Sequence, residues 1–427
     1  MAKFRWIVHG NLVTPTRNPF QGVDDPGAEW LGPGLRLFRD HYLCVTHEGT
    51  IYSISPDACD NADEVIRLTP TQFLIPGLVD LHFHAPQFSY AATDRPLTGP
   101  DGWLETYTFP AERNIHKHVY ERVVPTTLAA GTTTAVYWAT LHLKPTQELV
   151  DVVKEHGQRA WVGLLQMDRN APNDYVLSTE ENMRQTREFL ESFDGADTLV
   201  QPILTPRFIP TCTPALLKCL GQLVPRYAIT THVSESLDEV AWSKQLEGGA
   251  SDTQVLDQHG LLSNQCILAH AVHCSDADFA LLKKRGSAIA HCPLSNIYFA
   301  NGTLRCRSLL ERGNRVGLAT DVSGGYSPSL WNAQRTAVLV SHLLGEPLDH
   351  RHAFYLATLG GAEALNCADV FGSLREGLEF DALVVDAPNA FPDDSIADLF
   401  QKVCLLGDDR HVRRVFVRGQ QTLSKQL

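Results

Sequence analysis

The chain has 427 residues, a formal net charge of −13, 44% hydrophobic residues and 20% charged residues. A length and composition of this kind are typical of two or three packed structural units and argue against long disordered tracts. The negative charge disfavours binding to the phosphates of nucleic acid, so no nucleic-acid partner is expected.

The sequence also favours an intracellular location. Its N-terminus lacks the apolar core of a signal peptide, and no apolar run approaches the roughly 18 residues that a membrane span needs. Ten cysteines are scattered between Cys44 and Cys404 without a Cys-x-x-Cys pair, which indicates free thiols in a reducing compartment and no zinc ribbon. We therefore expect a cytoplasmic protein with no membrane partner.

Strand-like segments occur at both ends of the chain and are separated by turn residues. The segments are Trp6–Val13, Cys44–Ile54, Asp381–Asp386 and Val412–Arg418. We expect residues 1–72 and 371–427 to form one small β domain, with the remaining residues inserted between its two parts.

Residues 73–370 show a different sequence pattern. Short apolar runs end in polar residues and alternate with stretches long enough for helices. The expected strands are Leu74–Leu81, Thr132–Trp138, Ala160–Leu165, Leu199–Leu204, Tyr227–Thr231, Cys266–Ala269, Ala288–Ala290 and Val316–Ala319. Eight such strands predict an α/β fold, a (β/α)8 TIM-type barrel, whose active site lies at the C-terminal strand ends. The long connection Gln87–Asn114 could cover that site.

Histidines and an aspartate follow several of these runs. His82 and His84 are two apart in an extended segment, so their side chains point to the same side. His232, His270 and Asp321 each follow a later strand and should face the same rim. A lone His-x-His is equally consistent with a packing role, but nitrogen and oxygen ligands from several strand ends indicate a catalytic metal site.

Glu235 lies three residues after His232 and could reach the same rim as a proton shuttle. The other interpretation is an exposed glutamate at a helix start, because Ser234 to Glu239 also has the pattern of a helix opening. Its position alone does not decide between the two.

The order of these motifs resembles the amidohydrolase superfamily over nearly the whole chain. The matching segments are Pro76–His84, Thr231–Glu235, His270, His291–Asn296 and Asp321, together with Gly377–Ala382, which is similar to the superfamily's split β-sandwich domain. Within the superfamily, Thr108–Glu112, Pro206–Phe208 and Thr320–Ser327 resemble the guanine deaminase family.

The resemblance implies a set of site residues. By it, the metal ligands are His82, His84, His232 and Asp321; the catalytic residues are Glu235, His270 and Asp321; and the substrate-binding residues are Gln87, Arg207, Phe208, His232, Glu235 and Asp321. His291 fits a structural role better than a place among the ligands. No lysine occurs between Lys154 and Lys218, which argues against the carboxylated lysine of dinuclear relatives.

The resemblance further implies a homodimer with one Zn²⁺ per subunit, iron remaining open, and hydrolytic deamination of guanine to xanthine and ammonia by a metal-activated hydroxide. Without it, Arg207 would be assigned to a surface ion pair and Phe208 to the core. Two alternatives stay open: a related deaminase or chlorohydrolase acting on another purine, a pyrimidine or a triazine, and a metal-free amidohydrolase-like scaffold.

Overall fold

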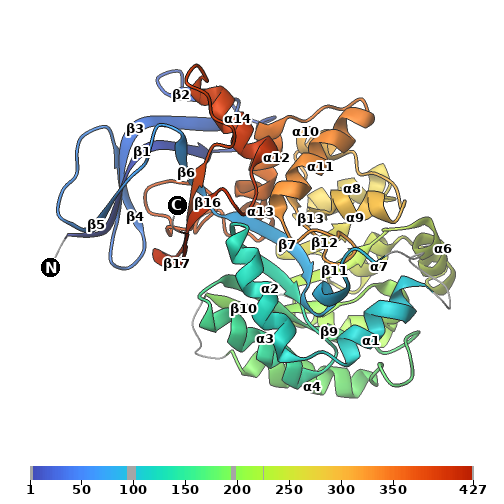
Figure 1. Cartoon of the computed structure of the whole chain (residues 1–427). Coiled ribbons are helices and arrows are strands. Elements are labelled where there is room, and N and C mark those ends of the chain that lie inside the picture. The colour runs from blue at the N-terminus through green and yellow to red at the C-terminus, as the bar shows by residue number, and fades with distance from the viewer. Residues whose placement is uncertain (1–2, 94–101, 194–198, 225, 426–427) are drawn as a thin grey trace.

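A sheet of eight parallel strands lies in the larger part of the molecule, to the right of the N-terminal strands of residues 4–67 in Figure 1. The computed structural model describes residues 3–93, 102–193, 199–224 and 226–425. The eight strands, which lie in sequence order around the sheet, are β7 (Leu78–His84), β8 (Thr132–Trp138), β9 (Arg159–Gln166), β10 (Val200–Pro206), β11 (Ile229–Val233), β12 (Cys266–His270), β13 (Ala288–His291) and β14 (Arg315–Leu318).

The two end strands meet just after β14. Asp321 N–H donates to the His82 carbonyl at 2.9 Å, and His84 N–H donates to the Val322 carbonyl at 3.0 Å. These bonds close the sheet into the predicted (β/α)8 barrel and bring Asp321 beside both histidines of β7. Strands such as β8 are buried along their whole length, as expected for a parallel sheet covered by helices.

Helices cover the outside of the barrel (Figure 1). They are α2 (Lys117–Ala129), α3 (Leu143–Glu155), α4 (Thr179–Glu191), α5 (Pro214–Gly221), α6 (Leu237–Leu246), α7 (Asp252–Gln258), α8 (Asp276–Arg285), α9 (Pro293–Tyr298), α10 (Cys306–Arg312), α11 (Leu330–Leu343), α12 (His350–Ala357) and α13 (Leu359–Ala364). Serine side chains at Ser236, Ser251 and Ser275 accept backbone N–H groups at the starts of α6, α7 and α8, which fixes where these helices begin. None of the helices within the described residues is both long and apolar enough to cross a membrane.

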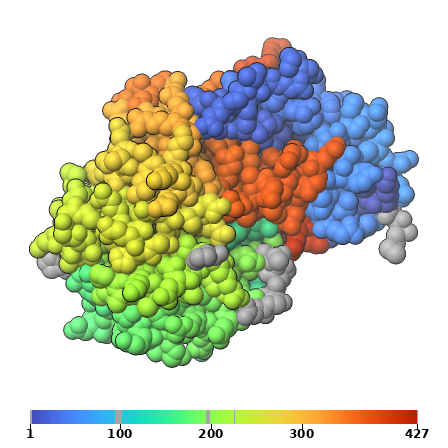
Figure 2. Space-filling view, turned by 180° about the vertical axis from the view of Figure 1, so that it is seen from behind, coloured from blue at the N-terminus to red at the C-terminus, as the bar shows by residue number. Residues whose placement is uncertain are grey.

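Both ends of the chain build a second, nine-stranded mixed sheet. Its strands are β1 (Phe4–Pro15), β2 (Glu29–Gly32), β3 (Leu35–Val45), β4 (Ile51–Ser55), β5 (Ala62–Arg67), β6 (Gln72–Pro76), β15 (Ala382–Asp386), β16 (Val412–Val417) and β17 (Gln420–Ser424). The helix α14 (Ile396–Leu406) connects β15 to β16. Figure 2 shows the blue N-terminal segment lying against the orange and red C-terminal segment, as expected for a domain formed by both ends.

The expected single strand Cys44–Ile54 is wrong. It is divided between β3 and β4, which pair antiparallel through a turn in which Thr46 N–H donates to the Thr50 carbonyl at 2.9 Å. Gly49 has a φ of 87° in this turn, and a Cβ there would lie 2.1 Å from the Arg418 carbonyl oxygen. Glycine is therefore required at the turn.

The expected strand Leu74–Leu81 is also wrong as a single element. Gln72–Pro76 forms β6, which pairs with β1 and β15 of the terminal sheet, whereas the barrel strand β7 begins at Leu78. The chain changes sheets at Gly77, where a Cβ would lie 2.0 Å from Thr133 Oγ1. The barrel pairing thus begins later than residue 73, and the division of the chain into two folding domains stays a prediction.

A buried ion pair joins the barrel to the terminal sheet. Arg159, in β9, donates through Nε to Asp381 Oδ2 at 2.9 Å and through Nη2 to Glu379 Oε2 at 2.5 Å. All ten cysteines are free thiols, as the sequence predicts, so this contact and the apolar core hold the two parts together without disulfides.

Candidate metal and substrate site

A cavity opens at the C-terminal ends of the barrel strands. It is lined by His84, Gln87, Trp103, Leu104, Thr108, Arg207, Phe208, His232, Glu235, Ser236, Glu239, His270, Phe299, Asp321 and Gly324. The cavity therefore collects the residues that the sequence analysis assigned to substrate binding and most of those that it assigned to catalysis and metal binding.

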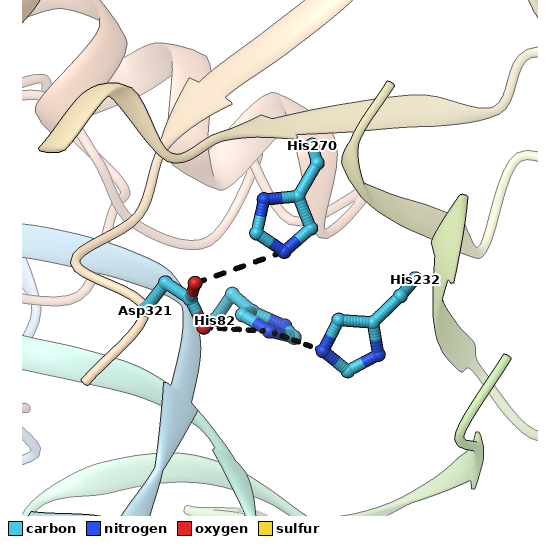
Figure 3. A group of neighbouring side chains, drawn as sticks. All are labelled: His82, His232, His270 and Asp321. Atoms are coloured by element: carbon cyan, nitrogen blue, oxygen red, sulfur yellow. Dashed lines mark hydrogen bonds and ion pairs between the residues drawn. The ribbon is translucent and has the colours of Figure 1, made fainter. Parts of the chain in front are cut away.

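Nitrogen and oxygen atoms converge at the floor of the cavity. His232 Nε2 lies 3.1 Å from the Nε2 atoms of both His82 and His84, and Asp321 Oδ1 lies 3.2 Å from His82 Nε2 and 3.5 Å from His84 Nε2. Figure 3 shows that His82, His232, His270 and Asp321 point toward one centre. The ligand atoms of these four residues lie within 4.8 Å of one another. This group contains His270, which was predicted to be catalytic, and does not contain the predicted ligand His84, although His84 Nε2 lies 3.1 Å from His232 Nε2.

These spacings fit a single divalent metal ion. Four ligands at roughly 2.0–2.1 Å from a tetrahedral Zn²⁺ stand about 3.3–3.4 Å from one another, close to the distances among His82, His84, His232 and Asp321. Burial lowers the pKa of each of the three imidazoles, which favours the neutral form that binds metals. Burial alone would raise the pKa of Asp321, but His270 and His82 lower it to about 2, so its carboxylate is ionised.

Hydrogen bonds behind the donors orient two of the imidazoles. His232 Nδ1 lies 2.7 Å from the Arg207 carbonyl, and His270 Nδ1 lies 2.9 Å from Asn296 Oδ1. Because both partners are acceptors, Nδ1 carries a proton in each ring, and Nε2 of His232 offers a lone pair to the cavity. Burial alone would lower the pKa of His270, but the Glu235 carboxylate raises it well above its usual value, so Nε2 of His270 can also carry a proton and donate to an oxygen atom. His270 Nε2 is buried and has no hydrogen-bond partner among the described residues, which suits a group that acts on something bound there.

The carboxylate of Asp80 aligns two of the metal-site segments. It accepts hydrogen bonds from Thr320 Oγ1 at 2.6 Å, Thr320 N at 3.1 Å and His82 N at 3.2 Å. These bonds tie the end of β7 to the segment that carries Asp321. Asp80 is fully buried, so its role is to position the donors.

Glu235 faces the cavity. It follows β11 and precedes Ser236, the residue that caps α6, so the predicted helix is present but Glu235 stands before it. Its side chain is 14% exposed, and its Oε2 lies 3.7 Å from His270 Nε2. Burial raises the pKa of Glu235 above its usual value, which favours a carboxyl group that can hold and release a proton.

Gln87, Arg207 and Phe208, the residues predicted to bind the substrate, also line the cavity. Arg207 is buried and pairs with the equally buried Glu112, so it does not form the surface ion pair considered for it. The Phe208 ring lies edge-on to Trp242 at 6.0 Å and also borders the cavity. Both residues are therefore placed to contact a bound ligand.

The connection after β7 contributes to the wall of the cavity. Its described parts include the short helices Ala85–Tyr90, Leu104–Thr108 and Phe109–Arg113, the last labelled α1. Trp103 and Leu104 of this connection line the cavity, in line with the expected cover. Residues 94–101 of the connection lie outside the described residues.

His291 lies at the end of β13 and is 1% exposed. It does not belong to the converging donor group formed by the described residues, and its place outside the metal ligands stays a prediction. Its hydrogen-bonding role stays a prediction, because its Nδ1 has no partner in the part of the chain that the structure describes.

Four polar residues of the site had no role assigned from sequence: the buried Asp80, Glu112 and Asn296, and the half-buried Asn301. Each forms a hydrogen bond with a residue of the site. Asp80 accepts from the nearby His82 N–H, whereas Glu112, Asn296 and Asn301 bond to Arg207, His270 and Glu235, which lie 95, 26 and 66 positions away. The only signal was that Asp80, Glu112 and Asn296 stand inside motifs that carry the family resemblance.

Comparison with known proteins finds a family and relatives that match most of this chain. The model of the amidohydrolase family matches residues 73–422. A guanine deaminase of Dictyostelium discoideum is 38% identical over 94% of this chain and 93% of its own length, and a guanine deaminase of Homo sapiens is 37% identical over 92% and 94%.

A solved structure shares the whole fold. The guanine deaminase from C. acetobutylicum, crystallised with guanine in its active site, has a TM-score of 0.88 and 31% identity, covering 97% of this chain and 99% of that one. The donor group at the barrel rim, the matching family model and these full-length relatives agree: the chain belongs to the amidohydrolase family, alongside the guanine deaminases.

Proposed function

We propose that this protein hydrolyses guanine to xanthine and ammonia and that it carries one Zn²⁺ per subunit. The observation that carries the proposal is one cavity in which a metal-type donor group lies beside Glu235 and beside the polar pair Gln87 and Arg207. The guanine deaminases to which the chain is similar along their whole length support the choice of substrate.

In this proposal, His82, His84, His232 and Asp321 hold the metal ion. A bound Zn²⁺ supplies a water molecule whose pKa falls from 15.7 toward about 7. Asp321 would accept a proton from the attacking water, because its ionised carboxylate lines the cavity; its second oxygen, Oδ2, lies 3.7 Å from His270 Nε2. His270 orients the attacking oxygen and stabilises the charge that develops on it.

Glu235 moves protons on the substrate side. It protonates ring N3 of guanine as water adds to C2, takes up the proton of the new C2 hydroxyl group, and passes that proton to the departing amino group. The proton that Asp321 accepted from water then returns to Glu235, so both carboxyl groups end as they began. The C2–N bond breaks, ammonia leaves, and the carbonyl of xanthine forms at C2. Guanine and water thus become xanthine and ammonia with no other reactant.

Arg207 and Gln87 select the base. Arg207 can donate to the O6 carbonyl of guanine, whereas the amino group of adenine at that position would place a donor against a donor. Phe208 offers an apolar face to the ring. Sites that hydrogen-bond their substrate in this way reject unmatched analogues strongly.

A parallel assay of guanine, adenine, cytosine and 8-oxoguanine tests this assignment. We expect ammonia release from guanine to be fastest, with adenine and cytosine far slower at equal enzyme concentration. If adenine, cytosine or a triazine were the preferred substrate, the related deaminase or chlorohydrolase would replace the guanine assignment. A well-folded protein that binds no stoichiometric metal would instead support the scaffold alternative.

We further propose that the protein is a cytoplasmic homodimer, as the family resemblance implies. Sedimentation velocity of the purified protein checks the assembly state, and a monomer at micromolar concentration would contradict it. Fractionation of cells checks the location.

A further inference from the structure

The carboxylate of Glu112 stands directly behind the substrate-binding pair. Glu112 lies on α1, is 1% exposed, and is absent from the cavity wall. Its Oε1 accepts from Gln87 Nε2 at 2.8 Å and from Arg207 Nη2 at 3.2 Å, and its Oε2 accepts from Arg207 Nη1 at 2.7 Å and from Tyr175 OH at 3.1 Å. One buried carboxylate therefore holds both polar residues that the proposed function assigns to substrate.

The first consequence concerns the orientation of the Gln87 amide. A carboxylate only accepts hydrogen bonds, so the amide group that faces Glu112 must be the NH₂. The Gln87 carbonyl oxygen Oε1 is then directed elsewhere and accepts a hydrogen bond from Ser323 N–H at 3.5 Å. Because Gln87 lines the cavity and a carbonyl oxygen has two lone pairs, this oxygen is the acceptor of fixed orientation that Gln87 can offer to a ligand.

The second consequence concerns Arg207. Its two Nη atoms engage the two oxygens of Glu112 in a bidentate pair, which fixes the plane of the guanidinium group. The Phe109 ring, whose centroid lies 5.3 Å from the guanidinium carbon, packs against the same group. Arg207 thus keeps its remaining N–H donors for the cavity, with its buried charge balanced by Glu112.

We infer that Glu112 is a positioning residue that sets the specificity of the site by holding an acceptor on Gln87 beside a donor on Arg207. This pair is complementary to a ring N–H next to a carbonyl group, as in a cyclic amide. An unprotonated ring nitrogen next to a carbon that carries an amino group presents the reverse order, an acceptor next to a donor. Such an edge is mismatched at both positions. The inference rests on the proposed function and names the residue that makes the site selective for the cyclic amide.

The substitution Glu112→Gln tests the inference, because it keeps the size of the side chain and removes the acceptor-only character. A glutamine there can face Gln87 with either its oxygen or its NH₂, so the Gln87 amide loses its single orientation. Guanine and 2,6-diaminopurine share the reacting 2-amino group but differ in the adjacent edge of the ring. The ratio of kcat/KM for guanine to that for 2,6-diaminopurine therefore measures how strongly the site discriminates between the two ring edges.

We expect E112Q to lower this ratio by about tenfold or more, mainly by raising KM for guanine, while the bound metal per subunit stays unchanged. The control is Glu363→Gln, which removes a half-buried carboxylate that accepts from Tyr355 OH at 2.6 Å and does not line the cavity. E363Q should keep the wild-type ratio. An E112Q enzyme that is less stable but equally selective would overturn the inference and leave Glu112 a purely structural residue.

Tyr175→Phe keeps the test decisive if E112Q does not fold, because it leaves Glu112 in place and removes one of its donors, together with the contacts of the same hydroxyl to Thr140 Oγ1 and Leu141 N. It should lower the selectivity ratio in the same direction by a smaller factor, and an unchanged ratio would contradict the inference. The wild-type enzyme separates this outcome from failure of the proposed function: if wild-type protein does not deaminate guanine, the proposed function fails before any variant is compared.

Discussion

Asn301 Nδ2 donates a hydrogen bond to Glu235 Oε1 at 3.1 Å, although the two residues are 66 positions apart. The main-chain carbonyl of Asn301 accepts a hydrogen bond from His273 Nε2 at 2.6 Å. The carboxyl group that the mechanism uses to move protons is therefore held in place by a loop residue from another part of the barrel.

Replacing Asn301 with leucine should lower kcat by about tenfold, because a general acid that loses its orientation loses part of its roughly 10²–10⁴-fold contribution. The bound metal per subunit should stay at the wild-type level. Steady-state kinetics with metal analysis checks both values. As a control, Asn314→Leu removes a hydrogen bond to the Phe279 carbonyl and should leave kcat unchanged; equal losses in both variants would contradict the role of Asn301.

Removing the carboxylate itself should have a larger effect. Glu235→Gln should reduce kcat on the order of 10²–10⁴-fold, because the amide cannot protonate the ring or the leaving group. The measurement is kcat on folded, metal-quantified protein. Near-normal turnover would mean that another residue moves the protons.

The metal site predicts a contrast between two buried histidines. His84→Ala should lose most of the bound metal, since His84 Nε2 lies within 3.5 Å of both His232 and Asp321 donor atoms. His291→Ala should retain the metal, because no hydrogen bond or ion pair among the described residues joins a His291 ring nitrogen to the donor atoms of His82, His84, His232 or Asp321. Elemental analysis of the two purified variants decides the matter, and retention of full metal by H84A would remove His84 from the ligand set.

Arg207 should matter for stability as well as for binding. Arg207→Met leaves the Glu112 carboxylate buried without its guanidinium partner, which should lower the free energy of unfolding by about 3–5 kcal/mol. Arg184→Met, which breaks exposed pairs with Glu181 and Glu188 on α4, should cost less than about 1 kcal/mol. Urea titration of both variants tests the contrast, and similar losses would show that burial of the pair has no special effect.

Asp278 predicts a pH-dependent contribution to stability. Burial alone would raise the pKa of Asp278, but hydrogen bonds from Ser251, Ser275 and Thr253 lower it below its usual value. A lowered pKa in the folded state means that the stabilisation is fully present above the unfolded pKa of about 3.9 and is lost as the pH falls through the folded value.

The difference in unfolding free energy between wild type and Asp278→Asn should therefore be largest near pH 7 and should shrink below about pH 4. Asp276→Asn is the matched control on the same helix, because the Asp276 side chain is 83% exposed. Urea titrations at several pH values check the trend, and a difference that grows toward low pH would reverse the sign and contradict the assignment.

The barrel and the donor residues were predictable because their physical signals are local. Buried parallel strands appear as short apolar runs, and a polar residue just after such a run faces the barrel rim. His82, His232, His270 and Asp321 all follow this rule. The strand Leu74–Leu81 shows where this rule fails. The end of β6 and the start of β7 form one apolar run, and the strand pairing shows that the chain changes sheets between Pro76 and Leu78.

The supporting residues could not be predicted from the sequence in the same way. Glu112, Asn296 and Asn301 act through partners that only the closed barrel brings within hydrogen-bond distance. A glutamate in a polar segment is usually exposed, so neither the burial of Glu112 nor its contact with Arg207, 95 positions away, has a local signal. Roles of this kind follow from three-dimensional contacts.

The most direct test of the central claim is xanthine formation from guanine by metal-quantified protein, measured beside a chelated sample and the same sample reconstituted with Zn²⁺. We predict steady xanthine production by the metal-loaded protein, loss of production after chelation, and recovery after Zn²⁺ is restored. Absence of xanthine from folded protein that carries one bound metal per subunit would contradict the assignment of guanine as substrate.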